Sequence, residues 1–117
     1  MARDLASLKC VPCQGGVPPL KGEEIKKLYQ DLGNGWEVVG EHHLVKKYNF
    51  SDFKTALSFV SKVGEMAEEI GHHPEISFGW GFATVQIFTH KIDGLYESDF
   101  IFAAKCDRLM EGSKNEG

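Results

Sequence analysis

Apolar side chains recur at helical spacing between Ser51 and Ile70, and this is the clearest pattern in the chain. One side of that stretch is apolar and the other carries mainly lysine, serine and glutamate, which is typical of a helix lying across a sheet. Ser51 can cap its start, Asp52 favours the positive end of the helix dipole, and Gly71 suits a left-handed stop. The apolar stripe consists of Phe53, Ala56, Leu57, Val60, Val63, Ala67 and Ile70.

Two shorter helices are predicted nearer the ends of the chain. Over residues 21–32 the apolar side chains again repeat at helical spacing, and the run ends at Gly33. A last helix is expected over about residues 98–110, after a loop at 91–96.

Four stretches have the composition, or the period of two, that marks β-strands. The first two, 36–40 and 43–50, are joined by Gly40-Glu41, which suits the tight turn of a hairpin. The other two, 76–80 and 83–88, follow the long helix. Two pairs of strands are therefore separated by that helix.

The predicted order is helix, two strands, helix, two strands, helix. An α+β fold satisfies it, with a four-stranded antiparallel sheet and three helices packed on one face. We expect residues 1–19 as an irregular arm, 20–111 as a single domain and 112–117 as a flexible tail. An uncovered sheet edge in so small a chain predicts a homodimer or homotetramer.

Composition and charge exclude several classes of function. The chain has 117 residues, 42% hydrophobic and 26% charged, which fits one globular domain. A net charge of −4 without a basic stripe disfavours direct binding of nucleic acid. No apolar run approaches the roughly 20 residues that cross a bilayer, and residues 1–9 lack the apolar block of a secretory signal. We therefore expect a cytoplasmic protein with no membrane partner.

The three cysteines are too few for a disulfide framework. Cys10 and Cys13 have metal-ligand or redox spacing, but a structural zinc site needs four ligands and the chain has no second such pair. The prolines and glycines around them do not fit the strand-to-helix setting of a redox motif. We favour an ordered arm with reduced thiols, and zinc completed by oligomer contacts is the alternative.

The histidines fall into two adjacent pairs and a single residue, and the pair His72-His73 is the most informative. Pro74 restricts His73 to extended backbone. Glu68 lies one helical turn before His72, where its carboxylate can fix the imidazole tautomer. The alternative is a polar helix end that faces water.

Spacing alone favours structural roles for the other candidates. His90 is typical of a strand end, and His42-His43 lies in a hairpin, where neighbouring side chains point to opposite faces. Trp36 and Trp80 could stack on a flat heterocycle, but we favour core packing for both. Asp99 is expected as a cap or first-turn acid of the last helix.

These separate residues fit together as one spaced set. The run from Glu68 through His72-His73-Pro74 is followed by Trp80, His90 and Asp99. In residue type and spacing the set resembles the signature of the pterin-4a-carbinolamine dehydratase family, and the similarity covers roughly residues 20–110.

Further stretches carry the same resemblance, and two positions depart from it. Gly35-Trp36 is similar to the family's tryptophan strand, and residues 47–53 are similar to the entry to its long helix. Many members have Arg where this chain has Ser98, and an aromatic residue is common where it has Ile76. Neither departure touches the three histidines of the signature.

The resemblance implies dehydration of 4a-hydroxytetrahydrobiopterin or a related pterin to the quinonoid dihydropterin, in support of tetrahydrobiopterin recycling, without a cofactor or metal. It implies that His72 and His90 form the acid–base pair and that His73 holds the hydroxylated carbon or shares the proton transfer. Glu68 is expected to orient His72, and Trp36 and Pro74 to line the slot for the flat ring. The residues expected to bind the substrate are Trp36, Glu68, Pro74, Thr89 and Asp99.

Two other functions stay open at this point. The family also resembles a transcriptional partner, a dimerisation cofactor of a homeodomain factor, which makes a protein-binding role one alternative. Pterin chemistry in molybdopterin metabolism is the other. Retention of all three histidines favours catalysis.

Overall fold

The computed structural model describes residues 5–10, 15–33 and 35–115, with the backbone alone for 111–115. Its order of helices and strands confirms the predicted α-β-β-α-β-β-α arrangement, with short 3-10 turns added in the arm and after the last strand. The elements are η1 (Leu5–Ser7), α1 (Glu23–Leu32), β1 (Glu37–Val39), β2 (His43–Asn49), α2 (Phe53–Ile70), β3 (Glu75–Gly79), β4 (Phe82–Ile87), η2 (His90–Ile92) and α3 (Glu97–Asn115).

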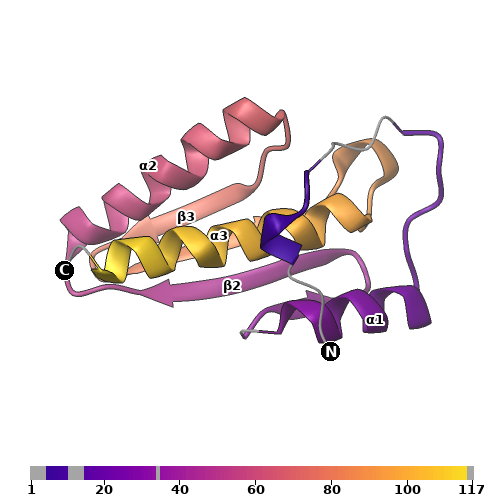
Figure 1. The fold of residues 1–117 in the computed structure, drawn as a ribbon, viewed down its shortest axis with the longest axis horizontal. Coiled ribbons are helices and arrows are strands. Elements are labelled where there is room, and N and C mark those ends of the chain that lie inside the picture. Colours follow the sequence, from indigo (N-terminus) through magenta and orange to yellow (C-terminus); the bar gives the residue numbers. More distant parts are fainter. Residues whose placement is uncertain (1–4, 11–14, 34, 116–117) are drawn as a thin grey trace.

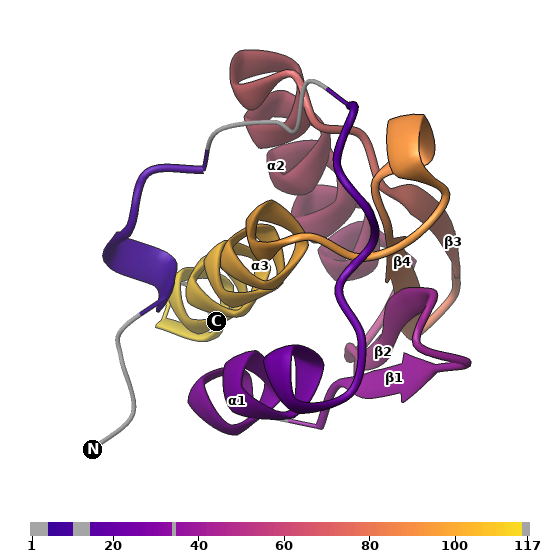
Figure 2. The same ribbon diagram turned by 90° about the vertical axis from the view of Figure 1, so that its right-hand side faces the viewer.

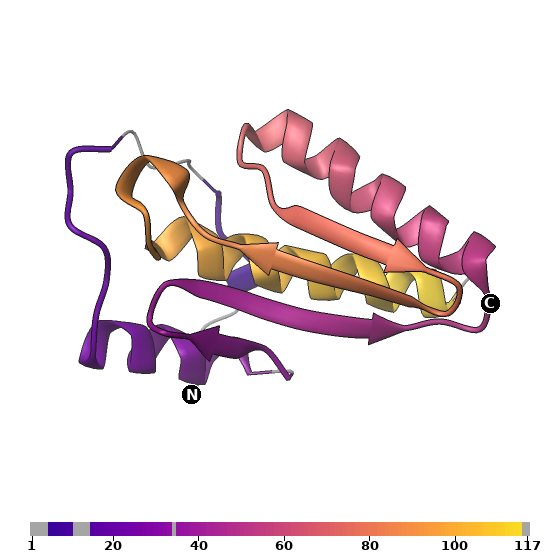
Figure 3. The ribbon, with the colours of Figure 1, turned by 180° about the vertical axis from the view of Figure 1, so that it is seen from behind.

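The four strands form one antiparallel sheet in the order β1-β2-β4-β3 (Figure 1). The helices lie on one face of it, as Figure 2 shows from the side, and Figure 3 looks onto the other face. Strand β4 is central, and its residues Ala83, Val85 and Ile87 are buried towards the helices in alternation with half-buried ones. This is the period of two that the sequence shows, so the predicted fold class is confirmed.

Helix α2 begins and ends on the residues that control the position of the candidate site. Asp52 is the N-cap, and its carboxylate accepts hydrogen bonds from the Thr55 N–H at 2.8 Å and the Thr55 hydroxyl at 2.6 Å. The prediction of Ser51 as the cap was therefore wrong by one residue. Gly71 has φ 84° and stops the helix in the left-handed conformation, as predicted.

The last helix is longer than its pattern suggested. It begins at Glu97 rather than Ser98 and continues to Asn115, beyond the predicted end at Met110 and into the expected flexible tail. Among the described residues, no helix combines the length and the apolar character needed to cross a membrane.

The N-terminal arm packs on the body of the domain. Leu5 and Ala6 are buried, and the Lys105 ammonium donates a hydrogen bond to the Ala6 carbonyl at 3.0 Å. Further along, the Leu20 N–H donates to the Leu95 carbonyl at 2.8 Å. The arm thus contacts both α3 and the segment that joins β4 to α3.

Gly94 lets the arm approach that connecting segment. A Cβ at Gly94 would lie 2.6 Å from Cβ and 2.9 Å from Cγ of Pro19, whose ring cannot rotate away. We expect Gly94→Ala to lower the free energy of unfolding by about 1–3 kcal/mol, as other overpacked sites do.

Urea denaturation followed by circular dichroism measures this change, with Gly64→Ala on α2 as the matched control. Apart from its chain neighbours and the backbone of its own helix, no described atom lies within 4 Å of a Cβ at Gly64, so helix propensity should raise stability there by up to about 1 kcal/mol. Equal effects at the two positions would contradict the proposed contact.

Candidate active site

His72 leaves helix α2 at a position that the backbone fixes. The N–H groups of Gly71 and His72 both donate to the Ala67 carbonyl, at 2.8 and 3.3 Å. The left-handed turn directs the His72 ring inward, where it is 7% exposed and meets the Phe102 ring edge to face.

Asp99 joins three segments beneath this ring. Its carboxylate is fully buried and accepts hydrogen bonds from His72 Nε2 at 2.6 Å, from the Thr89 hydroxyl at 2.8 Å and from the Tyr96 N–H at 2.8 Å. The bond to Tyr96 is that of an acid in the first turn reaching back to cap the helix, so the predicted first-turn role is confirmed. The other two bonds tie the ends of α2 and β4 to the start of α3.

Asp99 and Thr89 were expected to bind the substrate, and the structure places both out of solvent. Their side chains bond to each other, and Thr89 is only 4% exposed. In this chain they support His72 from behind, and direct contact with a substrate stays a prediction.

Glu68 pairs with a different histidine from the predicted one. Its carboxylate lies 2.5 Å from Nε2 of His73, and both side chains are largely exposed. The expectation that Glu68 orients His72 was wrong, because helical spacing does not continue past the left-handed Gly71. His72 turns inward to Asp99, and His73 takes the helix carboxylate instead.

His90 reaches the same end of the sheet through its neighbour Thr89. It is the first residue of η2, its ring is exposed, and the ring centroid lies 4.2 Å from that of Phe88. A bridge between Thr89 and Gly94 closes the short turn. Thr89 and His72 share the Asp99 carboxylate, so the residues that follow them, His90 and His73, also lie at this end.

The two tryptophans lie elsewhere. Trp36 is 1% exposed, and its indole N–H donates to Asp107 at 3.0 Å. Asp107 lies two helical turns beyond Asp99, or ~12 Å along α3. The predicted core packing of Trp36 is therefore confirmed, and its expected contact with the flat ring of a substrate stays a prediction.

Trp80 contradicts the prediction of core packing. It is 72% exposed in the turn between β3 and β4, at the end of β3 that lies away from the histidines. The flanking Gly79 and Gly81, the latter with φ 84°, were the signal for a turn rather than a strand.

The sequence of the candidate site is matched by a family profile described as Pterin 4 alpha carbinolamine dehydratase, over residues 18–109. That range contains the histidines, their carboxylate partners and the whole sheet. The chain belongs to the pterin-4a-carbinolamine dehydratase family.

The alignments with similar relatives cover nearly the whole length of those relatives. A protein of Rubrobacter xylanophilus, provisionally named pterin-4-alpha-carbinolamine dehydratase, is 63% identical over 106 residues, covering 91% of this chain and 98% of the relative. A protein of Alkaliphilus metalliredigens with the same provisional name is 49% identical over 105 residues, covering 90% and 95%.

Two solved structures have a similar fold. One, described as a transcriptional coactivator/pterin dehydratase from Brucella melitensis, has a TM-score of 0.72 at 29% identity and covers 78% of this chain and 97% of its own. The other, described as a pterin dehydratase-like protein that is a RuBisCO assembly factor in the alpha-carboxysome, has a TM-score of 0.57 at 25% identity and covers 66% and 90%.

The two cysteines of this family member that the structure describes, Cys10 and Cys106, are buried. Burial raises the pKa of the Cys10 thiol to about 11, and burial likewise raises the pKa of Cys106. Cys10 lies against the carbonyl of the buried Ser98, at 3.5 Å. Cys13 lies outside the described residues, within which no three potential ligands gather as a metal site.

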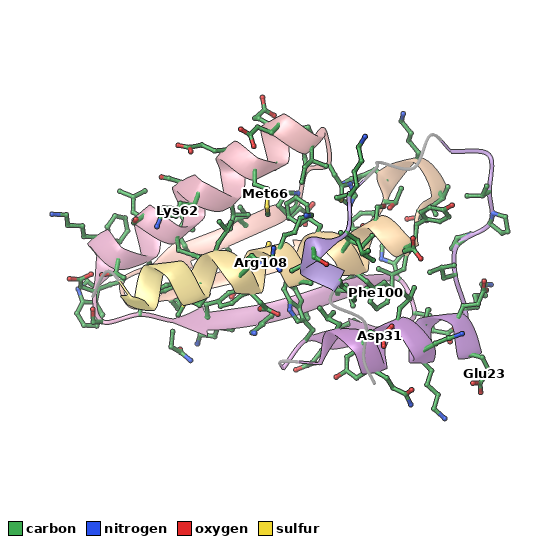
Figure 4. The ribbon with its side chains drawn as sticks, viewed as in Figure 1. Glu23, Asp31, Lys62, Met66, Phe100 and Arg108 are labelled. Atoms are coloured by element: carbon green, nitrogen blue, oxygen red, sulfur yellow. The ribbon has the colours of Figure 1, made fainter. Side chains whose placement is uncertain are left out.

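One hollow was not foreseen from the sequence. A groove of about 610 Å³ lies between the arm, the end of α2 and α3, and none of the described residues that line it is a histidine. Met66 and Arg108 face its interior from the two helices (Figure 4). Lys9 and Lys105 also line it. No pattern in the sequence predicted that these two lysines lie near each other.

The pair His42-His43 was misplaced by the sequence argument. The two rings contact each other, with their Nδ1 atoms 3.1 Å apart, and do not point to opposite faces. His42 precedes β2 and lies in the turn, where the alternation of a strand does not apply. All five histidines consequently lie around one end of the sheet, since the His42 ring also contacts Phe88 at 4.5 Å.

Proposed function

We propose that this protein removes water from a 4a-hydroxytetrahydropterin to give the quinonoid dihydropterin, in the recycling of tetrahydrobiopterin. The observation that carries the proposal is the pairing of two adjacent histidines with carboxylates, His72 with Asp99 and His73 with Glu68, next to His90 at one end of the sheet. Membership of the family supports the same chemistry.

The reaction consists of two proton transfers around one bond change. The C4a–O bond breaks, the N5–H proton is removed, and the electrons of the N–H bond form the C4a=N5 double bond. The departing hydroxide leaves as water once it takes up a proton. Imidazole gives and accepts protons near neutral pH without strong tuning, so histidine suits both tasks.

Each carboxylate influences which ring nitrogen of its histidine carries the proton and which one can accept a proton. A carboxylate that accepts from Nε2–H leaves the Nδ1 lone pair of a neutral ring free to take a proton. Asp99 lies at hydrogen-bond distance from Nε2 of His72, and Glu68 from Nε2 of His73, so each carboxylate favours the Nε2–H tautomer of its partner. We assign His72 and His90 as the acid–base pair, with His73 binding the hydroxylated carbon or sharing the proton transfer.

Pro74 is proposed to line the pterin slot. It follows His73 directly and is half-buried. Its ring also holds His73 in extended backbone, which keeps the second imidazole beside the first.

A dehydration assay with purified protein tests the activity. The 4a-carbinolamine is generated in place, and formation of the quinonoid product is followed by its absorbance. We expect clear acceleration over the spontaneous reaction, lost in a His72→Ala/His90→Ala double variant. A rate no faster than the spontaneous one would refute the proposal.

A protein-binding role is the second candidate, supported by the descriptions of the two similar structures as a coactivator and an assembly factor. Affinity capture with the intact chain tests it. A partner that the double variant captures as well as the native chain does would show binding independent of the histidine site.

A further inference from the structure

The turn before β2 makes direct contact with the turn that carries His90. His42 Nε2 lies 2.7 Å from Oδ1 of Asp93, which is 51 residues away in the chain and ends η2. The His42 ring also lies 4.5 Å from that of Phe88, whose other neighbour is the His90 ring at 4.2 Å. Two independent contacts therefore link His42 to the segment around His90.

Asp93 has a backbone conformation that favours glycine. Its φ is 49° and its ψ is 52°, in the left-handed region that Asp and Asn enter at some cost and most other residues avoid. A glycine would fit there without strain, so the residue present supplies something that glycine lacks. The carboxylate bonded to His42 is that contribution.

The hydrogen-bond chain also continues away from Asp93. If the His42 Nε2–H donates to Asp93, the Nδ1 atom of the neutral ring accepts, and His43 donates to it from its own Nδ1–H at 3.1 Å. Burial is the largest cause that lowers the pKa of His43, and it favours the neutral form of that ring. The chain from His43 through His42 to Asp93 thus has one consistent set of donors.

We infer that His42 is a positioning residue for His90. Its bond to Asp93 and its ring contact with Phe88 hold the turn of residues 90–93 and set the direction of the His90 imidazole. The inference rests on the proposed function, because His90 matters here as half of the acid–base pair. His42 acts through the turn and need not touch the pterin.

The matched variants are at Asp93. Asp93→Gly keeps the left-handed backbone and removes the acceptor, and Asp93→Asn keeps both the conformation and an oxygen that can accept from His42. We expect Asp93→Gly and His42→Ala each to lower kcat by about 3–10-fold with KM little changed, because the reacting group is misdirected rather than the substrate released. Asp93→Asn should restore most of the turnover.

The double variant His42→Ala/Asp93→Gly adds a test of coupling. It should be no slower than His42→Ala, since that variant already lacks the contact with Asp93. Multiplying losses would overturn the inference. The thermal midpoint should change by less than about 2 °C in all of these variants, because the pair is exposed.

A second readout does not depend on turnover. The ring carbon–proton signal of His90, assigned by its loss in His90→Asn, should shift in Asp93→Gly and return towards the native position in Asp93→Asn. Normal kcat and an unmoved signal in Asp93→Gly would overturn the inference and leave the proposed function standing. An inactive native protein would refute the proposed function, and the His90 signal would still decide whether His42 positions that ring.

Discussion

Asp99→Ala is expected to lower the free energy of unfolding by about 3–5 kcal/mol, because it removes the acceptor of three hydrogen bonds at a buried position. The Nε2–H group of the His72 ring, the hydroxyl of Thr89 and the backbone N–H of Tyr96 would lose their partner together. Each buried donor without an acceptor costs about 1–3 kcal/mol. Urea denaturation of the purified variant measures the loss.

Asp99→Asn separates stability from chemistry. The amide oxygen can serve Thr89 and Tyr96, while the NH₂ group then faces His72 and forces its Nε2 to accept. We expect most of the stability to return, with the His72 tautomer reversed and turnover lower by ~10²-fold or more. Nitrogen chemical shifts of the His72 ring report the tautomer, and native shifts with native turnover would contradict the role given to Asp99.

His90→Ala is expected to reduce turnover by ~10²-fold or more, the usual loss on removing a general acid or base. His90 is exposed, so its loss should leave the unfolding midpoint within about 2 °C of the native value. His72→Ala should lose a similar factor in turnover and also lose stability, because His72 is buried on Asp99.

Lys91→Ala is the control for His90→Ala. Lys91 is the next residue of the same turn and is also exposed, so general disturbance of the turn would lower both activities alike. Steady-state rates with the carbinolamine substrate measure the difference. Near-native turnover in both His72→Ala and His90→Ala would remove the acid–base pair from the mechanism.

The helices and strands were predictable because each one carries its own pattern. The alternation on β4 is local and predicts its burial against the helices. The stripe on α2 was right in part: Ala56, Val63 and Ala67 are buried, whereas Phe53 and Leu57 are exposed and the buried Phe59 lay outside the predicted stripe. The errors at the ends have local causes too. Asp52 rather than Ser51 caps α2, and two glycines place Trp80 in a turn.

The pairing of histidines with carboxylates was not predictable from spacing. Glu68 stands one helical turn before His72, and it lost that partner because Gly71 reverses the chain. His72 pairs instead with Asp99, which lies 27 residues further along the chain, at the start of α3. The spacing of residues along the chain does not show whether His72 pairs with Glu68 or with Asp99, because the chain changes direction at Gly71.

The sequence by itself determined the elements, the single sheet with helices on one face, and the family, through residue types at fixed intervals. Only the tertiary structure decided that β2 lies beside β4, with Leu44 opposite Ile87, which brings His42 to the His90 turn. The strand order β1-β2-β4-β3 depends on how whole layers bury their apolar faces together. Contacts between residues 51 positions apart are a result of that packing, and no periodicity along the chain records them.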